Sequence, residues 1–277
     1  MPSPPIQGPR ASGGASATAP ILETRGLSKD FRGFTAVDDV NLQVQEGHIH
    51  ALIGPNGAGK TTVFNLLTRF LPATRGEILY RGKSITRMKS HEIARLGLVR
   101  SFQISAVFSQ MTVLENLRVA LQRPQGTSFH FWKPERSLDS LNEQALHLLE
   151  QVGLRDDAHR VTASLPYGRK RALELATTLA LEPTVMLLDE PTQGMGAEDV
   201  DRVVELIRVA ARGRTVLMVE HNLSVVSRLC DRISVLARGR VLAEGDYASV
   251  SANPEVREAY LGSEAPESTA DEHKEVS

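Results

Sequence analysis

The pattern of apolar and polar residues predicts alternating strands and helices along most of the chain. Apolar residues alternate with polar ones over residues 40–44, as in a half-buried strand. A short apolar run at 49–53 stops at Gly54, as a buried parallel strand would. After it, apolar residues over 63–70 follow the spacing of one helix face. We therefore predict a strand, a glycine-rich loop and a helix in this order.

The second half of the chain shows the same alternation. Apolar runs at 185–188, 215–219 and 233–236 have the length of buried strands, and helical periodicity separates them, for example over 200–207. This arrangement is typical of a mainly parallel sheet covered on both faces. Gly239 marks a predicted hairpin turn after the last run.

Three further segments differ from this pattern. Residues from about 91 to 165 have helical patterns, broken by a polar, proline-containing stretch at 123–137 that is a loop or an insertion. Residues 1–20 are rich in proline, glycine, alanine and serine, and residues 263–277 are polar and acidic. We expect both ends to be disordered tails.

Composition narrows the possible function classes. The 277 residues contain 32 Lys and Arg against 33 Asp and Glu, so the chain lacks the basic excess of a general nucleic-acid-binding protein. Its one cysteine, Cys230, excludes an internal disulfide and fits a reducing compartment. No apolar run approaches the roughly 18 residues that span a bilayer, and residues 1–20 lack the apolar core of a signal peptide. We expect a cytosolic protein that meets the membrane only through a partner.

The loop after the first buried strand matches the pattern G-x-x-x-x-G-K-[ST] in full. Glycines let its backbone curl and point N–H groups at an anion, and the following helix adds its positive N-terminal end. The lysine is expected to reach the β- and γ-phosphates of ATP, and the following threonine hydroxyl to bind Mg²⁺. A chance match is the alternative, which the strand before and the helix after disfavour. The predicted nucleotide-binding residues are Gly54, Pro55, Asn56, Gly57, Ala58, Gly59, Lys60, Thr61 and Thr62.

The apolar run at 185–188 ends in two carboxylates, Asp189 and Glu190. A carboxylate at a strand end beside the phosphate loop can hold Mg²⁺ through water, and Asp189 is placed for that. Glu190 follows on the other face of the chain and is predicted to polarise the water that attacks the γ-phosphate. A solvated acidic pair in a turn is the alternative, and the complete phosphate loop favours the site.

His221 follows the apolar run at 215–219 and Glu220. In a parallel sheet the carboxyl ends of the strands form the ligand-binding edge. His221 is therefore predicted to hydrogen-bond the γ-phosphate or the attacking water. Other histidines, such as His48 and His50, show no such arrangement and are interpreted as structural.

The order of these elements over about residues 22–262 resembles an ATP-binding subunit of the ABC-transporter family. The sequence RSFQ places Gln103 where the family has a glutamine that binds Mg²⁺ and contacts the membrane partner. Phe31 resembles the aromatic residue that stacks on adenine, with Phe34 as a near rival.

Residues 165–171, LPYGRKR, resemble the family's signature motif, which caps the γ-phosphate bound by the opposite subunit. The resemblance thus implies Tyr167 and Gly168 as nucleotide contacts. Two departures stand out. Pro166 replaces the usual serine and lacks its hydroxyl, and Gly196 holds the position where the family usually has an aspartate that contacts the other subunit.

The resemblance implies an α/β fold: a phosphate-loop NTPase core with a mainly parallel sheet, an antiparallel β subdomain, and a helical subdomain inserted at about 91–165. The signature LPYG, the loop RSFQ and the carboxyl-end sequence AYLG at 259–262 resemble the branch that imports branched-chain amino acids, whose relatives import urea or other small amides. It implies an ATPase that uses ATP and Mg²⁺ and pairs with a second ATP-binding subunit, identical or homologous. Two membrane permeases and, indirectly, a solute-binding protein would complete the transporter at the cytoplasmic face of the plasma membrane.

Two other classes compete with a transport ATPase. A soluble ABC ATPase that acts on nucleic acid or ribosomes usually has two such domains in one chain or a long coiled-coil insert, and this chain has one phosphate loop. An unrelated phosphate-loop kinase or GTPase would lack the signature helix. The transported solute is not specified by this sequence, because the permeases and the binding protein contact it.

Overall fold

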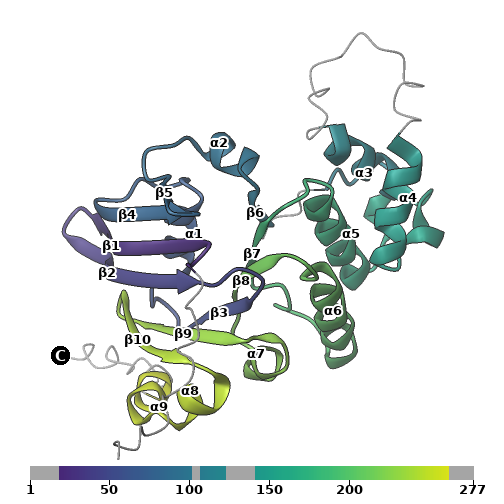
Figure 1. Cartoon of the computed structure of the whole chain (residues 1–277). Helices are drawn as coiled ribbons and strands as arrows, with labels where there is room; N and C mark the ends of the chain where they lie inside the picture. Colours follow the sequence, from purple (N-terminus) through teal and green to yellow (C-terminus); the bar gives the residue numbers. More distant parts are fainter. Residues whose placement is uncertain (1–18, 102–106, 123–140, 262–277) are drawn as a thin grey trace, which may run out of the picture.

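A computed structural model describes residues 19–101, 107–122 and 141–261 of the chain (Figure 1). The predicted tails, apart from residues 19 and 20, lie outside these ranges. So does the polar stretch at 123–137.

A six-stranded sheet forms the centre of the molecule, in the order β10-β9-β3-β8-β7-β6. The neighbouring pairs from β9 to β6 are all parallel, and β10 joins β9 as an antiparallel hairpin. Every residue of β3, β7 and β8 is buried, which explains their mostly apolar sequences and confirms the predicted strands. The strands are β3 (Ile49–Ile53), β6 (Leu98–Ser101), β7 (Val185–Asp189), β8 (Thr215–Val219), β9 (Arg232–Ala237) and β10 (Arg240–Gly245).

The predicted hairpin turn joins β9 to β10. Arg238 and Gly239 both have positive φ angles, 49° and 79°. Two consecutive residues of this kind form the tight turn that matches the twist of a hairpin. This prediction is confirmed.

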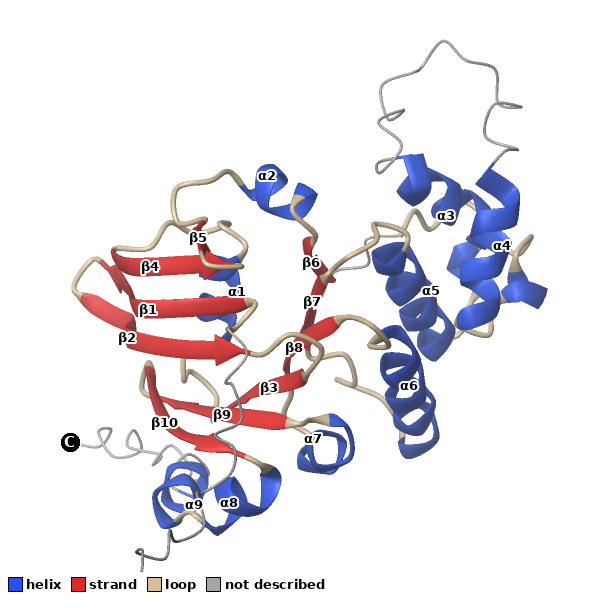
Figure 2. Ribbon diagram, viewed as in Figure 1, coloured by secondary structure: helices blue, strands red, loops and turns tan. Residues whose placement is uncertain are grey.

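A second, four-stranded antiparallel sheet packs beside the first, in the order β2-β1-β4-β5 (Figure 2). Its strands are β1 (Leu22–Phe31), β2 (Phe34–Val44), β4 (Arg75–Tyr80) and β5 (Lys83–Ser84). Over residues 40–44 of β2, buried and exposed side chains alternate as predicted. One apolar cluster joins this sheet to α1 (Lys60–Leu67) and to one face of the six-stranded sheet.

Helices cover the other face of the six-stranded sheet. A second apolar cluster contains residues of β3, β7 and β8 together with α3, α4, α5 and α6. Figure 1 shows α3, α4 and α5 gathered in a helical lobe at the right of the molecule. The remaining helices are α2, α7, α8 and α9. The bounds of all the helices after α1 are α2 (Ser90–Arg95), α3 (Val113–Gln122), α4 (Asn142–Gln151), α5 (Tyr167–Leu179), α6 (Ala197–Ala210), α7 (Leu223–Leu229), α8 (Tyr247–Ala252) and α9 (Pro254–Leu261).

The helical range predicted at about 91–165 was wrong at its start. It includes β6, which pairs with β7 in the parallel sheet, and the first described helix of the lobe, α3, begins at Val113. A four-residue strand directly after a short helix has too few residues for its period to be recognised.

The first helix was also predicted too long. It ends at Leu67, because Arg69 adopts a positive φ of 59° that a helix cannot continue. Phe70 therefore lies outside the helix and is 53% exposed.

Among the described residues, no helix combines the length and apolar character needed to cross a bilayer.

Candidate functional site

The phosphate loop connects the buried end of β3 to the first turn of α1. Gly54 and Gly59 have φ angles of 150° and 102°. A Cβ atom at Gly54 would lie 2.0 Å from the carbonyl oxygen of Leu236, and one at Gly59 would lie 2.5 Å from that of Ala36. Only glycine fits at both positions, so the loop packs directly on β9 and β2. The backbone N–H groups at the start of α1 are left to bind an anion.

Lys60 is enclosed by this loop and is only 6% exposed. Its Nζ donates hydrogen bonds to the carbonyl oxygens of Gly54 at 2.7 Å and Pro55 at 2.9 Å. Burial lowers the pKa of Lys60, while the charges of Glu190 and Asp189 oppose that shift. The ammonium group therefore lies inside the loop and within the field of both predicted acidic residues.

Asp189 ends β7 and is 3% exposed. Its Oδ2 forms an ion pair with Arg100 on the neighbouring strand β6. Its Oδ1 is buried and has no hydrogen-bond partner in the described part of the chain. A free carboxylate oxygen is a ligand that Mg²⁺ prefers, and Thr61, an exposed residue in the first turn of α1, offers a hydroxyl.

No group of three or more His, Cys, Asp or Glu side chains able to hold a metal ion occurs in the ranges that the structure describes. Asp189 and Thr61 offer a carboxylate and a hydroxyl, which fit a cation bound mainly through nucleotide oxygens.

Glu190 and His221 meet at the carboxyl edge of the parallel sheet. His221 Nε2 lies 2.6 Å from Glu190 Oε1, although the residues follow different strands, β7 and β8. Glu190 has a positive φ of 45°, and its N–H donates to the carbonyl of Val219 at 2.9 Å. This backbone arrangement directs the Glu190 carboxylate toward the imidazole of His221. The His221 side chain is 41% exposed.

Glu220 is a residue of this edge that the sequence analysis passed over. It is 3% exposed, and its Oε1 accepts hydrogen bonds from the N–H and the hydroxyl of Thr192. Its Oε2 accepts from the N–H groups of His221 at 2.8 Å and Asn222 at 3.0 Å. The carboxylate thus ties the loop after Glu190 to the loop that carries His221. A charged residue at the end of an apolar strand, directly before His221, was the available signal.

The signature segment opens α5. Pro166 is the N-cap residue of α5 and supplies no side-chain cap, and the helix begins at Tyr167. Tyr167 is 49% exposed and its hydroxyl donates to the carbonyl of Gln193 at 3.3 Å. A Cβ atom at Gly168 would lie 3.0 Å from Asp199 Oδ1 on α6.

Within one chain, the signature segment and the phosphate loop lie on different faces of the sheet. Helix α5 contributes to the apolar cluster on one face and α1 to the cluster on the other. The described structure therefore does not bring Tyr167 and Gly168 to the phosphate loop of the same chain.

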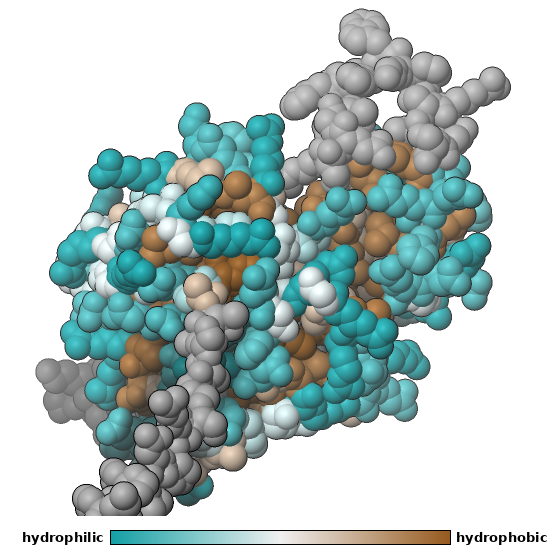
Figure 3. Space-filling model, viewed as in Figure 1, coloured by the Kyte–Doolittle hydropathy of each residue, from teal (hydrophilic) through white to brown (hydrophobic). Residues whose placement is uncertain are grey.

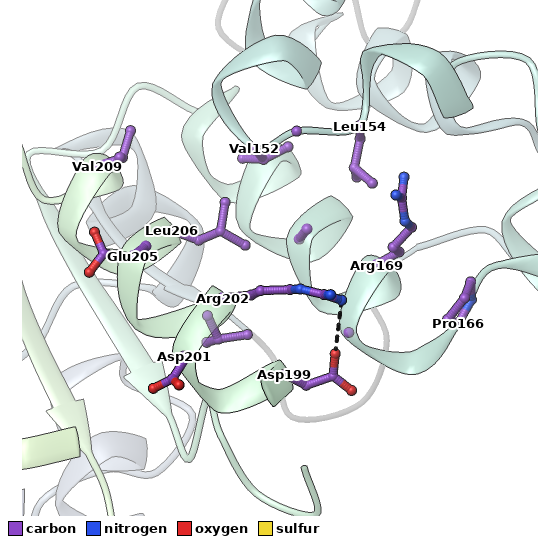
Figure 4. A pocket seen from close by; sticks show the side chains of 14 residues that line it. Val152, Leu154, Pro166, Arg169, Asp199, Asp201, Arg202, Glu205, Leu206 and Val209 are labelled. Atoms are coloured by element: carbon purple, nitrogen blue, oxygen red, sulfur yellow. Dashed lines mark ion pairs between the residues drawn. The ribbon is translucent and has the colours of Figure 1, made fainter. Parts of the chain in front are cut away.

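A cavity of about 630 Å³ lies beside the signature segment, between α5, α6 and the end of α4 (Figure 4). Arg202 and Asp199 form an ion pair at 3.5 Å on its wall. Its lining includes none of the phosphate-loop residues and neither Glu190 nor His221. The cavity thus borders the signature segment through Pro166 and Gly168, and it is separate from the phosphate loop and from the pair Glu190 and His221.

For two predicted residues, Gln103 and Phe31, the role in the site stays a prediction. Gln103 lies outside the described residues. Phe31 is 42% exposed and its ring centroid is 5.1 Å from Lys29 Nζ, while Phe34, its partner across the turn, is 66% exposed. Both aromatic rings are accessible, and the choice between them stays a prediction.

Comparison with known proteins places this geometry in a family. A model described as ABC transporter matches residues 37–193. The chain belongs to the ABC transporter family. It is an ATPase of that family, as the sequence predicted. A further model, described as branched-chain amino acid ATP-binding cassette transporter, matches residues 240–266.

Individual relatives cover most of this ABC chain. The high-affinity branched-chain amino acid transport ATP-binding protein BraF of Pseudomonas aeruginosa is 42% identical, over 88% of this chain and 98% of BraF. The protein LivG of Escherichia coli K12, described in the same words, is 39% identical with the same coverage. The crystal structure of an ATP-binding cassette of an ABC transporter in its ADP conformation has a TM-score of 0.77 and 30% identity, over 88% of this chain and 100% of that chain. The predicted fold class is confirmed.

Proposed function

We propose that this chain is the ATP-hydrolysing subunit of an importer for branched-chain or related amino acids. The family model matched at 240–266 and the names of the relatives BraF and LivG support this solute class. The observation that carries the hydrolytic part is the contact between Glu190 and His221 at the edge of the sheet that also bears the phosphate loop.

The proposed chemistry begins with the triphosphate. ATP phosphates bind to backbone N–H groups of the loop and of the first turn of α1, over residues 56–62. The Lys60 ammonium exchanges the Gly54 and Pro55 carbonyls for β- and γ-phosphate oxygens. Thr61 and Asp189 would hold Mg²⁺, with Gln103 as the third predicted ligand. When bound, this ion neutralises charge on the phosphates.

Glu190 is proposed to accept the proton of the attacking water. His221 donates from Nε2 to the Glu190 carboxylate or to the γ-phosphate, which fixes the orientation of both groups. Glu220 keeps the two loops in register and does not itself contact the substrate. Because these hydrogen bonds already hold the two loops in place, the site needs little reorganisation when the reaction occurs.

A complete site would require two chains. Because α1 and α5 lie on opposite sheet faces of one subunit, the signature segment is available to the phosphate loop of a second ATP-binding subunit. Two such sites would form one closed interface. Tyr167, exposed at the start of α5, is placed for that contact.

The helical lobe is the proposed docking region for the permeases. Its exposed apolar side chains include Phe108 (53% exposed), Met111 (36%) and Val161 (43%). Figure 3 shows hydrophobic surface over this lobe, among mostly hydrophilic surroundings. Apolar patches of this kind commonly mark protein interfaces. Docking there would hold the chain at the cytoplasmic face of the membrane.

Reconstitution tests the proposal. The chain is co-purified with two candidate permeases and placed in liposomes with ATP inside. We expect uptake of labelled leucine that depends on ATP and on the matching binding protein. Uptake of urea but not leucine would change the solute class. ATPase activity that responds to RNA or ribosomes, and not to permeases, would contradict the transport role.

A further inference from the structure

Arg100, near the end of β6, joins the phosphate-loop helix to the acidic strand. Its Nη1 donates to Asn65 Oδ1 on α1 at 2.6 Å, and its Nη2 pairs with Asp189 Oδ2 on β7. Its guanidinium carbon lies 5.7 Å from the ring centroid of Phe64. The Arg100 side chain is 10% exposed and that of Asp189 is 1% exposed. The two arms of one rigid, planar group therefore connect α1 with β7 in a largely buried setting.

The two connected elements carry the two groups that would hold a cation. Asn65 follows Thr61 by four residues on α1, so both side chains lie on the same side of the helix. At the other end, Arg100 occupies Asp189 Oδ2, while Oδ1 stays buried without a partner in the described chain. The arginine thus fixes the carboxylate and leaves one oxygen for a ligand.

We propose that Arg100 is a positioning residue of the cation site, setting the separation of Thr61 and Asp189 through its two-armed contact with Asn65 and Asp189. The inference rests on the proposed function, in which Thr61 and Asp189 hold Mg²⁺. Ligating carboxylates commonly depend on hydrogen-bonded groups behind them, whose loss weakens metal affinity about 10–100-fold.

Simple charge neutralisation predicts the opposite effect. Removing Arg100 leaves the negative charge of Asp189 uncompensated, so a cation would bind more tightly if neutralisation were the only role. Loss of positioning makes the cation bind more weakly. The direction of the change in cation affinity therefore separates the two roles.

The experiment measures cation affinity apart from turnover. A fluorescent ATP analogue is bound in EDTA, Mg²⁺ is titrated, and the ion concentration at half-maximal response is recorded. For Arg100→Met we expect this concentration to rise about 10–100-fold. Arg100→Lys should fall between Met and the natural arginine, because an ammonium keeps the charge but cannot span both partners with a planar fork.

Asn65→Ala provides a variant that keeps the buried ion pair. It removes one arm of the contact only, so it should fold even if Arg100→Met does not, and it should also weaken the cation response. Arg81→Met is the matched control, because Arg81 pairs with exposed Glu46 at 3.1 Å. Its response should equal that of the unmodified chain. Circular dichroism confirms folding of each variant.

An unchanged or tighter cation response in Asn65→Ala or in folded Arg100→Met would overturn the inference. Asp189→Asn separates this failure from failure of the proposed function. If Asp189→Asn weakens the cation response and the Arg100 variants do not, only the positioning role is wrong. If Asp189→Asn has no effect, the metal-ligand assignment fails and the inference fails with it.

Discussion

The Nε2 atom of His221 lies 2.6 Å from Oε1 of Glu190, across the boundary between two neighbouring strands. The parallel register of β7 and β8 pairs Asp189 with Val219, so the residues that follow each strand emerge side by side. The Glu190 carboxylate, which can accept a proton, therefore meets the His221 imidazole, which can donate one. They meet at the same edge of the sheet at which β3 ends and the phosphate loop begins.

His221→Ala is expected to lower the ATPase rate about 100-fold or more and to leave ATP binding nearly intact, because a positioned acid–base group contributes about 10²–10⁴-fold in rate. Steady-state kinetics and nucleotide binding on the purified chain measure both quantities. His91→Ala is the control, since His91 is exposed. Normal turnover with weakened binding would contradict the role given to His221.

Glu190→Gln is expected to trap an ATP-bound dimer. The amide keeps the side-chain shape but cannot accept a proton from water, and the lost negative charge favours the triphosphate. Because ATP is proposed to bridge two subunits, binding shifts the equilibrium toward the dimer. Size-exclusion chromatography should show a dimer with ATP and a monomer with ADP. A variant that binds millimolar ATP and stays monomeric would refute the shared site.

Lys60→Ala is expected to abolish hydrolysis and weaken ATP binding by roughly 1.5–3 kcal/mol, the size of a charge-assisted hydrogen bond. The transition state should lose more, because charge builds on the γ-phosphate. Isothermal calorimetry and phosphate release measure the two effects. Full activity in a variant with a normal circular dichroism spectrum is the result that would disprove the assignment.

Pro166→Ser is expected to preserve folding and ATPase activity and to strengthen ATP-driven dimerisation. A serine N-cap contributes about 1 kcal/mol, which the loss of proline rigidity, about 0.4–1 kcal/mol, largely offsets. The new hydroxyl is available to the partner's γ-phosphate. The dimer fraction with ATP is compared in the Glu190→Gln background. Loss of ATPase activity in a folded variant would indicate a role for Pro166 that its N-cap position does not explain.

His50 should make stability depend on pH. Burial lowers its pKa to about 3, and the charge of Arg232 acts in the same direction, whereas an unfolded histidine has a pKa near 6.5. Between these values the unfolded chain binds a proton that the folded chain does not. Stability therefore falls as pH decreases from about 6.5 toward 3, by up to about 1.4 kcal/mol per pH unit.

Replacing His50 by glutamine removes this titration. His50 Nε2 lies 2.8 Å from Ser234 Oγ, a contact that an amide can retain. The melting temperature of the natural chain should drop more between pH 7 and pH 5 than that of His50→Gln. Equal drops would show that His50 does not control the acid response.

Local patterns were sufficient to predict the central strands and the phosphate loop. Buried strands such as β7 and β8 read as continuous apolar runs, and Gly54 and Gly59 are required by carbonyl groups that leave no room for a Cβ atom. The carboxylates and His221 could be placed because parallel strands end at a common edge.

Other features depend on tertiary contacts between distant segments. Arg100 pairs with Asp189 across 89 positions, and Glu220 binds Thr192 across 28, so neither partnership has a local signal. Strand β6 is stabilised by β7 and not by its own four-residue pattern. The roles of Gln103, Phe31 and Tyr167 require a bound nucleotide or a second chain and stay predictions.

The positive φ of 45° at Glu190 lowers the stability of the folded chain at a residue that hydrolysis is proposed to need. A residue other than glycine in the left-handed region costs on the order of 1–3 kcal/mol, which glycine at this position would recover in part. Glycine would also remove the carboxylate that meets His221. Selection of variants of this chain for heat resistance alone would thus favour hydrolytically dead sequences at position 190, and directed evolution for robustness needs a concurrent screen for phosphate release.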